Sequence, residues 1–164
     1  MGQCNSKTSR CIIFGNVWLY RPLQCAYGAI IHIGGYTDDD VKANDICQRA
    51  HFAAAEVLKP GVLADTVYQA WQETINQAGL SHYQRHHCGY AVGIGFPPSW
   101  SGAGVPRGLR KGSTMKIKKG MVFHLMSWLM GTGVGNAFMS DTVVVQDEGC
   151  EFLTVSDRNL LFKM

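Results

Sequence analysis

Apolar positions along the chain predict two strands, then two helices, and then a second series of strands. Residues 11–20 and 25–33 are apolar runs rich in Ile, Val and aromatic side chains, which is typical of β-strands. From about Asp38 to Lys59, small and apolar residues recur at spacings of three and four, so they share one face of a helix. After the helix-stopping pair Pro60-Gly61, the same spacing predicts a second helix over about residues 64–78.

The later strands are short and interrupted by glycine. A basic, glycine-rich loop over residues 101–120 separates the first of them from the rest. Strands, two helices and a further antiparallel series of strands predict an α+β domain. The four later strands are expected over Gly89–Phe96, Met121–Met130, Asp141–Gln146 and Cys150–Val155.

Composition is typical of one folded domain. The chain has 164 residues, of which 46% are hydrophobic and 16% are charged. A domain of this size buries roughly 68–70% of the surface that its unfolded chain exposes, so a core can form without disulfides or metals. The net charge of +3 is too small to indicate a nucleic-acid partner. No apolar run approaches the roughly 18 residues that a membrane-spanning helix needs.

Two features bear on localisation. The six cysteines form no Cys-x-x-Cys pair and the first residues lack a secretory pattern, so we expect reduced thiols in a cytoplasmic protein. Gly2 and Ser6 fit the N-myristoylation pattern, and Cys4 could accept a palmitoyl chain as a second anchor. Alternatively, the Gly2 and Ser6 pattern occurs by chance. We expect membrane contact only if Gly2 is acylated.

Residues 74–140 contain no Asp or Glu, and we refer to them as the carboxylate-free stretch. A site built from this stretch must work without carboxylates. Its basic loop lacks the interleaved aromatic residues of a nucleic-acid surface, so we interpret the loop as solvated. The cations of the stretch are Arg85, Arg107, Arg110, Lys111, Lys116, Lys118 and Lys119.

Three histidines in this stretch are candidates for acid–base chemistry. His86 and His87 precede an expected strand, and adjacent strand residues point to opposite faces, so at most one of them can face a site. His124 lies inside an apolar strand, on the same face as Val122 and Met126. It is either a core histidine with satisfied hydrogen bonds or a catalytic base, because imidazole titrates near neutral pH.

Two other motifs in this region do not support a site. Cys88 follows the two histidines, but neighbours on a strand do not share a face, so we do not expect a cysteine nucleophile. Gly93-x-Gly95 precedes Pro97-Pro98, so no helix amino terminus is available there to hold a phosphate.

Three blocks of the sequence carry a family resemblance. They are residues 60–79, residues 88–100, and residues 118–129 followed by 140–154. In this order they resemble the carboxy-terminal half of the pita-bread fold of methionine aminopeptidases, Xaa-Pro peptidases and creatinases. Within that group they look most like the branch of ectoine hydrolases and Xaa-Pro dipeptidase-like proteins.

The resemblance implies a shortened pita-bread domain, in which two helices pack on a curved antiparallel sheet. It covers residues 26–162, so we expect a partial domain over 26–164 and an extension or strand over 1–25. The family domain is considerably longer and its first half faces the second across a pseudo-twofold axis. The chain is therefore expected to be a fragment or a shortened paralogue. A homodimer partner could cover its apolar strand faces.

The resemblance also indicates that the family's metal ligands are missing. Its metal enzymes hold two divalent ions with two Asp, one His and two Glu. The matching positions here carry Tyr90 for the histidine, Met126 for one glutamate and Ser140 for the last, with Asp141 matching the acidic residue after it. The strand over 26–33 has no carboxylate either. Phenol and thioether do not replace hard carboxylate ligands, so no metal or other cofactor is expected.

The resemblance implies a function for a site without metal ligands, because creatinases work in the same fold without a metal. The expected activity is metal-independent hydrolysis of an amide or amidine C–N bond in a small, amino-acid-derived substrate. The alternatives are a non-catalytic scaffold module and a metallopeptidase of the Xaa-Pro type. We expect His124 to act as the general acid–base and Tyr90 to polarise the scissile group. Asp141 would hold a cationic nitrogen of the substrate or His124 itself, and His87 would be a second proton carrier. The residues expected to bind the substrate are Trp100, His86 and Ser140.

Overall fold

The computed structural model describes residues 10–20, 23–93, 107–154 and 161–163. These residues form two helices and one eight-stranded sheet. The elements in chain order are β1 (Arg10–Tyr20), β2 (Leu23–Ile33), α1 (Asp38–Val57), α2 (Ala64–Gln77), β3 (Gly89–Ala91), β4 (Gly108–Leu109), β5 (Val122–Leu129), β6 (Ala137–Gln146), β7 (Gly149–Phe152) and β8 (Leu161–Lys163).

The sheet has the order β1-β2-β6-β5-β3-β4, with neighbouring strands antiparallel. Strand β7 pairs with β6, and β8 pairs in parallel with β2. The expected domain boundary between residues 25 and 26 falls inside β2. Strand β1 pairs with β2 along its whole length, from Arg10 opposite Ile33 to Tyr20 opposite Leu23, so it belongs to the same sheet.

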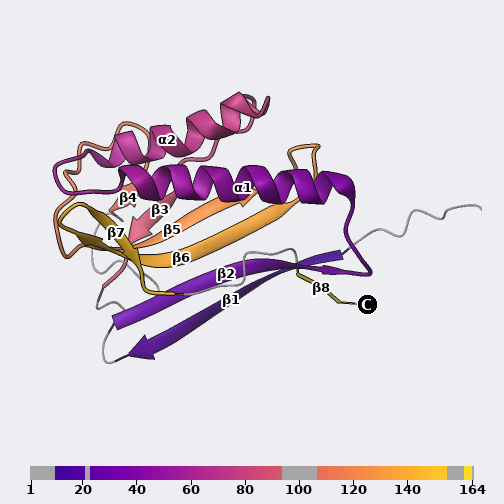
Figure 1. The fold of residues 1–164 in the computed structure, drawn as a ribbon, viewed down its shortest axis with the longest axis horizontal. Helices are drawn as coiled ribbons and strands as arrows, with labels where there is room; N and C mark the ends of the chain where they lie inside the picture. Colours follow the sequence, from indigo (N-terminus) through magenta and orange to yellow (C-terminus); the bar gives the residue numbers. More distant parts are fainter. Residues whose placement is uncertain (1–9, 21–22, 94–106, 155–160, 164) are drawn as a thin grey trace, which may run out of the picture.

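Both helices lie on the same side of the sheet (Figure 1). Helix α1 packs on β5 and β6, and α2 packs against α1 and β4. The expected fold class, two helices on an antiparallel sheet, is therefore confirmed. Between the helices and the sheet lies a core in which each fully buried Val, Ile, Leu or Phe contributes about 1.5–3 kcal/mol. Its largest apolar members are Trp71, Phe123, Leu58, Ile75, Leu109, Ile117, Leu125 and Leu129.

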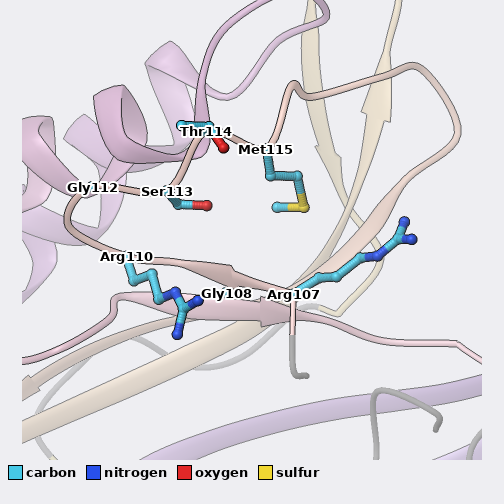
Figure 2. Close-up of a pocket in the computed structure, with 7 residues that line it drawn as sticks. All are labelled: Arg107, Gly108, Arg110, Gly112, Ser113, Thr114 and Met115. Carbon is cyan, nitrogen blue, oxygen red and sulfur yellow. The ribbon is translucent and has the colours of Figure 1, made fainter. Parts of the chain in front are cut away.

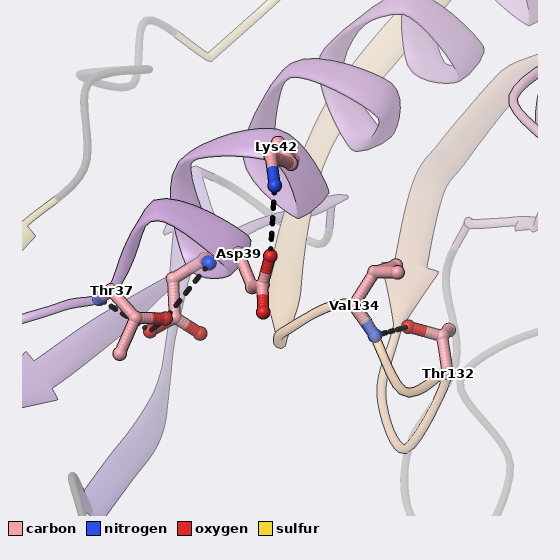
Figure 3. A network of polar contacts seen from close by, with 6 residues as sticks. Thr37, Asp39, Lys42, Thr132 and Val134 are labelled. Carbon is pink, nitrogen blue, oxygen red and sulfur yellow. Dashed lines mark hydrogen bonds and ion pairs between the residues drawn. The ribbon is translucent and has the colours of Figure 1, made fainter.

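Helix α1 begins with a capping box. The Thr37 hydroxyl accepts a hydrogen bond from the Asp40 backbone N–H at 3.2 Å, and the Asp40 carboxylate accepts from the Thr37 N–H at 2.9 Å. Figure 3 shows this end of the helix, with the exposed Lys42–Asp39 ion pair beside it. In the neighbouring β5–β6 turn, the Val134 N–H donates to the Thr132 hydroxyl (Figure 3). Three acidic residues in the first turn complement the helix dipole.

The helix ends agree closely with the sequence pattern. Helix α1 ends at Val57, two residues before the expected limit, because a residue that precedes a proline, such as Lys59, disfavours helical geometry. Helix α2 ends at Gln77, and Gly79 takes a positive φ of 83° after it, which glycine adopts without strain. Neither described helix is long and apolar enough to cross a membrane.

Candidate functional site

Strands β3 and β5 bring Tyr90 and His124 together. The two residues are directly opposite each other in the antiparallel register, where side chains share a face and interact. The Tyr90 hydroxyl lies 2.8 Å from Nδ1 of His124, and the two rings meet edge-on with centroids 5.2 Å apart. The structure therefore joins, by one hydrogen bond, two residues that the sequence marked as candidates.

Burial controls the charge of His124. Its side chain is 8% exposed, and desolvation lowers its pKa to about 4. His51 and His87 lower the pKa further by charge repulsion, and Asp141 opposes them. His124 is therefore neutral at pH 7. Its Nε2 atom is buried and has no hydrogen-bond partner among the described residues, so one ring nitrogen is engaged by Tyr90 and the other is available.

Tyr90 is also neutral at pH 7. Its side chain is half-buried, and burial raises the pKa of the phenol. The pair therefore contains a phenol and an imidazole, both uncharged and each able to donate or accept one proton.

Ser140 lies on the same face of the sheet as His124. In the β5–β6 register Ser140 is opposite Met126, and His124 is opposite Thr142, so the four side chains share one face. The Ser140 hydroxyl is fully buried and has no hydrogen-bond partner in the described part of the chain. By contrast, the Thr142 hydroxyl donates to the carbonyl of Ala26 at 2.7 Å. Two buried polar atoms on this face, one on His124 and one on Ser140, thus have no hydrogen-bond partner among the described residues.

His87 extends the group of rings beside Tyr90. Its ring centroid lies 6.1 Å from that of Tyr90 and 4.5 Å from that of His86. Burial lowers the pKa of His87 to about 4, with His86 and Arg85 adding to the shift by charge repulsion. His87 thus contacts Tyr90 of the pair, whereas His86 is exposed. Trp100, the expected pocket wall, lies outside the described residues.

Asp141 lies on the opposite face of the sheet from His124. It is opposite Leu125 in the register, and its side chain points toward α1. One carboxylate oxygen is 3.2 Å from Nε2 of His51, and the other accepts a hydrogen bond from the Thr154 hydroxyl at 2.8 Å. The register thus places the Asp141 side chain on the other face of the sheet from that of His124, and its printed hydrogen bonds link β6 to α1 and Thr154. Asp141 acts on His124 through its charge, which raises the pKa of the imidazole.

Sequence reasoning missed His51, the partner of Asp141. His51 is fully buried in α1, four residues after the buried Cys47 and on the same face of the helix. Its ring contacts Phe52 and Phe152, each with centroids 5.9 Å away. A histidine within an otherwise apolar helix face was the available signal, because a buried imidazole needs a polar partner.

The donors at the metal-matching positions do not fit a pair of divalent ions. The side chains at these positions are the Tyr90 phenol, the Met126 thioether and the Ser140 hydroxyl, and hard divalent ions select carboxylates instead. Among residues 10–20, 23–93, 107–154 and 161–163, no three His, Cys, Asp or Glu side chains are grouped to hold one ion.

Cys88 is buried in the core, where desolvation raises the pKa of its thiol and keeps it protonated.

Two open depressions lie near the basic loop. The first has a volume of about 350 Å³ and is lined by Arg107, Gly108, Arg110, Gly112, Ser113, Thr114 and Met115 (Figure 2). The second has a volume of about 500 Å³ and is lined by Tyr68, Gln84, Arg85, His86, Arg110, Lys111 and Gly112. Neither depression is lined by Tyr90 or His124.

Comparisons with known proteins agree with this architecture. A 111-residue segment is 37% identical to an uncharacterised hydrolase/peptidase, y4tL, of Sinorhizobium fredii, covering 66% of this chain and 26% of that protein. A 143-residue segment is 28% identical to an Xaa-Pro dipeptidase of Pyrococcus furiosus, covering 87% of this chain and 39% of the relative. The crystal structure of an X-Pro aminopeptidase from Thermotoga maritima superposes with a TM-score of 0.80 at 19% identity, covering 93% of this chain and 41% of the other.

These comparisons confirm the expected pita-bread fold. The chain spans only about a quarter to two fifths of the length of these three proteins. The family model for the metallopeptidases of family M24 matches residues 20–147, which is most of the chain. The chain therefore belongs to the metallopeptidase family M24.

Proposed function

We propose that this chain carries the acid–base site of a metal-independent hydrolase that cleaves an amide or amidine C–N bond in a small, amino-acid-derived substrate. Membership of a peptidase family supports hydrolysis in general. The observation that carries the metal-independent mechanism is the neutral Tyr90–His124 pair, whose second imidazole nitrogen is buried and has no partner among the residues that the structure describes.

In this mechanism His124 acts through Nε2. In the tautomer with a proton on Nδ1, the imidazole donates to the Tyr90 oxygen and presents an unprotonated Nε2. This nitrogen takes a proton from a water molecule as the water oxygen bonds to the carbonyl or amidine carbon. The imidazolium then returns the proton to the nitrogen of the breaking C–N bond, so that protons balance over the cycle.

Tyr90 has a separate role in the same step. In that tautomer the phenol accepts from His124 and its own O–H is free to donate. We assign this proton to a hydrogen bond with the oxygen or nitrogen that gains negative charge as the water adds. Because burial raises the pKa of Tyr90, the phenol keeps its proton at neutral pH. Ser140 and His87 lie close enough in the fold to be proposed as substrate contacts.

Hydrolysis assays test this proposal. The substrates are an Xaa-Pro dipeptide and ectoine, assayed with the metal content of the protein measured in parallel. His124→Ala should lower kcat/KM by about 10²–10⁴-fold, the usual contribution of one general acid–base. His82→Ala is the matched control, since His82 is exposed and is given no part in the proposed site. Full turnover by His124→Ala would remove the residue from the mechanism.

A non-catalytic scaffold module is the second candidate. Its support is that His124 and Ser140 are almost completely buried and that neither depression reaches the pair. Absence of turnover on both substrates, with a correctly folded protein, would favour the scaffold.

A third candidate is an Xaa-Pro metallopeptidase, because the chain belongs to a metallopeptidase family. Two tightly bound metal ions per chain, together with loss of activity on chelation, would support it against our proposal.

A further inference from the structure

The turn over residues 110–113 is the wall shared by the two depressions. Arg110 and Gly112 line both of them, with a volume of about 350 Å³ on one side and about 500 Å³ on the other. Both volumes lie in the range of about 300–1,000 Å³ that is typical of small-molecule sites. One ligand at this turn could therefore contact residues of both depressions.

Both depressions are lined by cations and, among the described residues, by no carboxylate. Arg107 and Arg110 line the first, and Arg85, Lys111 and Arg110 line the second. In the part of the chain that the structure describes, none of these guanidinium or ammonium groups forms an ion pair. The Arg85 guanidinium instead lies 4.8 Å from the centroid of the Trp128 ring, which holds it in place.

One carboxylate contacts the turn and fixes it. Asp65, near the start of α2, accepts the Gly112 backbone N–H at 2.6 Å and the side-chain amide of Gln69 at 3.3 Å. Gly112 has a positive φ of 72°, which suits a tight turn. The bond to Asp65 is made to the backbone, so the side chains of Arg110 and Lys111 remain free to contact a ligand.

Further backbone bonds hold the segment on both sides of the turn. The Arg107 carbonyl accepts from Ala91 at 2.8 Å, and the Met115 carbonyl accepts from Ala64 at 2.9 Å. Figure 2 shows the Ser113 hydroxyl pointing into the first depression, with the Arg107 and Arg110 guanidinium groups at its two ends. No side-chain hydrogen bond engages the Ser113 hydroxyl within the described residues. The backbone that carries these donors is thus held in place before any ligand arrives.

We propose that this turn binds a small oxyanion that carries at least two negative charges. The charge is supplied by a phosphate ester or by a polycarboxylate, because guanidinium groups pair with either group through two hydrogen bonds. The Ser113 hydroxyl adds a neutral donor. A nucleic acid is the weaker fit, because the lining offers few aromatic side chains for base stacking. Tyr90 and His124 do not line this site, although Gly108 of the first depression is opposite Tyr90 in the β3–β4 register, and the proposal does not depend on the hydrolase activity.

An NMR titration of the full chain tests the site. Sodium phosphate and sodium citrate are added in separate experiments, with ionic strength held constant by sodium chloride. Backbone amides over 107–115 should shift and saturate. Arg110→Gln should weaken binding about tenfold, because it removes one charge-assisted contact. Lys118→Gln removes the same charge from an exposed residue outside both depressions, and should change binding by less than about twofold.

The two probes separate the sources of the anion. Saturation by phosphate alone assigns a phosphate ester, and saturation by citrate alone assigns a polycarboxylate. Equal weakening by Arg110→Gln and Lys118→Gln would overturn the proposal, as would shifts that fail to saturate. The proposal is also overturned if an oligo-aspartate peptide or a DNA oligonucleotide binds while neither small anion does.

Discussion

Two buried histidines on opposite faces of the same sheet have different partners. On the helix-covered face, His51 bonds to the Asp141 carboxylate, which also accepts from Thr154. On the other face, His124 bonds to the Tyr90 phenol and lies beside the Ser140 hydroxyl, which no described residue hydrogen-bonds. The first arrangement joins a helix to a strand through a carboxylate. The second keeps two neutral proton carriers together, which is the property expected of an acid–base site.

The largest effect on stability should come from Asp141. Asp141→Asn removes the negative charge of a carboxylate whose two oxygens contact His51 and Thr154, and leaves an amide with only one acceptor atom for the two contacts. We expect the free energy of unfolding to fall by about 3 kcal/mol, as for the loss of buried hydrogen bonds to a charged group. Urea unfolding measures it. Asp147→Asn is the control, because Asp147 pairs with Lys119 on the surface and should change stability by less than about 1 kcal/mol. Equal losses in both variants would contradict the structural role.

Acid should destabilise the protein through His124. Its pKa of about 4 in the folded state lies below the ordinary value of 6.5, so unfolded chains bind the proton first as the pH falls. This stabilisation is present above pH 6.5 and is lost as the pH falls toward 4. Between pH 7 and pH 5 the loss should be about 2 kcal/mol.

The variant His124→Gln isolates this contribution. Glutamine keeps a polar group opposite Tyr90 but does not titrate, so the difference between the two proteins reports His124 rather than His87. Urea unfolding at pH 7 and pH 5 gives the comparison. If both proteins lose the same stability on acidification, the low pKa of His124 is not supported.

A smaller effect is expected at Thr154. Its hydroxyl donates to Asp141 at 2.8 Å and accepts from the Thr142 N–H at 3.0 Å. Thr154→Val keeps the shape but removes both bonds, so we expect a loss of about 1–3 kcal/mol, toward the lower end because one oxygen of Asp141 keeps its contact with His51. Thermal unfolding measures it, and an unchanged midpoint would show that the bonds contribute little.

The smallest effect should be at Ser140, and it can have the opposite sign. The Ser140 hydroxyl is buried without a partner among the described residues, so Ser140→Ala removes an unsatisfied group. We expect stability to be unchanged or to rise by up to about 1 kcal/mol. Under the proposed function the same variant should weaken substrate binding. A clear loss of stability would mean that the hydroxyl has a structural partner.

The sequence predicted the helices and the face of His124 well, because both depend on local periodicity. It did not predict the register that places Tyr90 opposite His124, since pairing between distant strands is set by the tertiary fold. Strand β6 begins at Ala137 rather than Asp141, because its first residues are apolar on both faces and give no alternation. In the described chain, β3 ends at Ala91, and the rest of the range expected up to Phe96 lies largely outside it.

Asp141 could have been placed correctly from the sequence. The rule that adjacent strand residues point to opposite faces was applied to His86 and His87. Applied to Ser140 and Asp141, it separates these two residues in the same way. The depressions beside the basic loop were harder to predict. They depend on how the turn packs against α2, which residue spacing alone does not reveal.

A pH titration of His124 by NMR tests the acid–base pair most directly. The ring carbon and nitrogen signals of the labelled protein report both the pKa and the tautomer, with His124→Gln used to assign them. We predict titration near a pKa of about 4 and, above it, a neutral ring that carries its proton on Nδ1. A pKa at or above 6.5, or a neutral ring protonated on Nε2, would contradict the proposed use of Nε2 as the base.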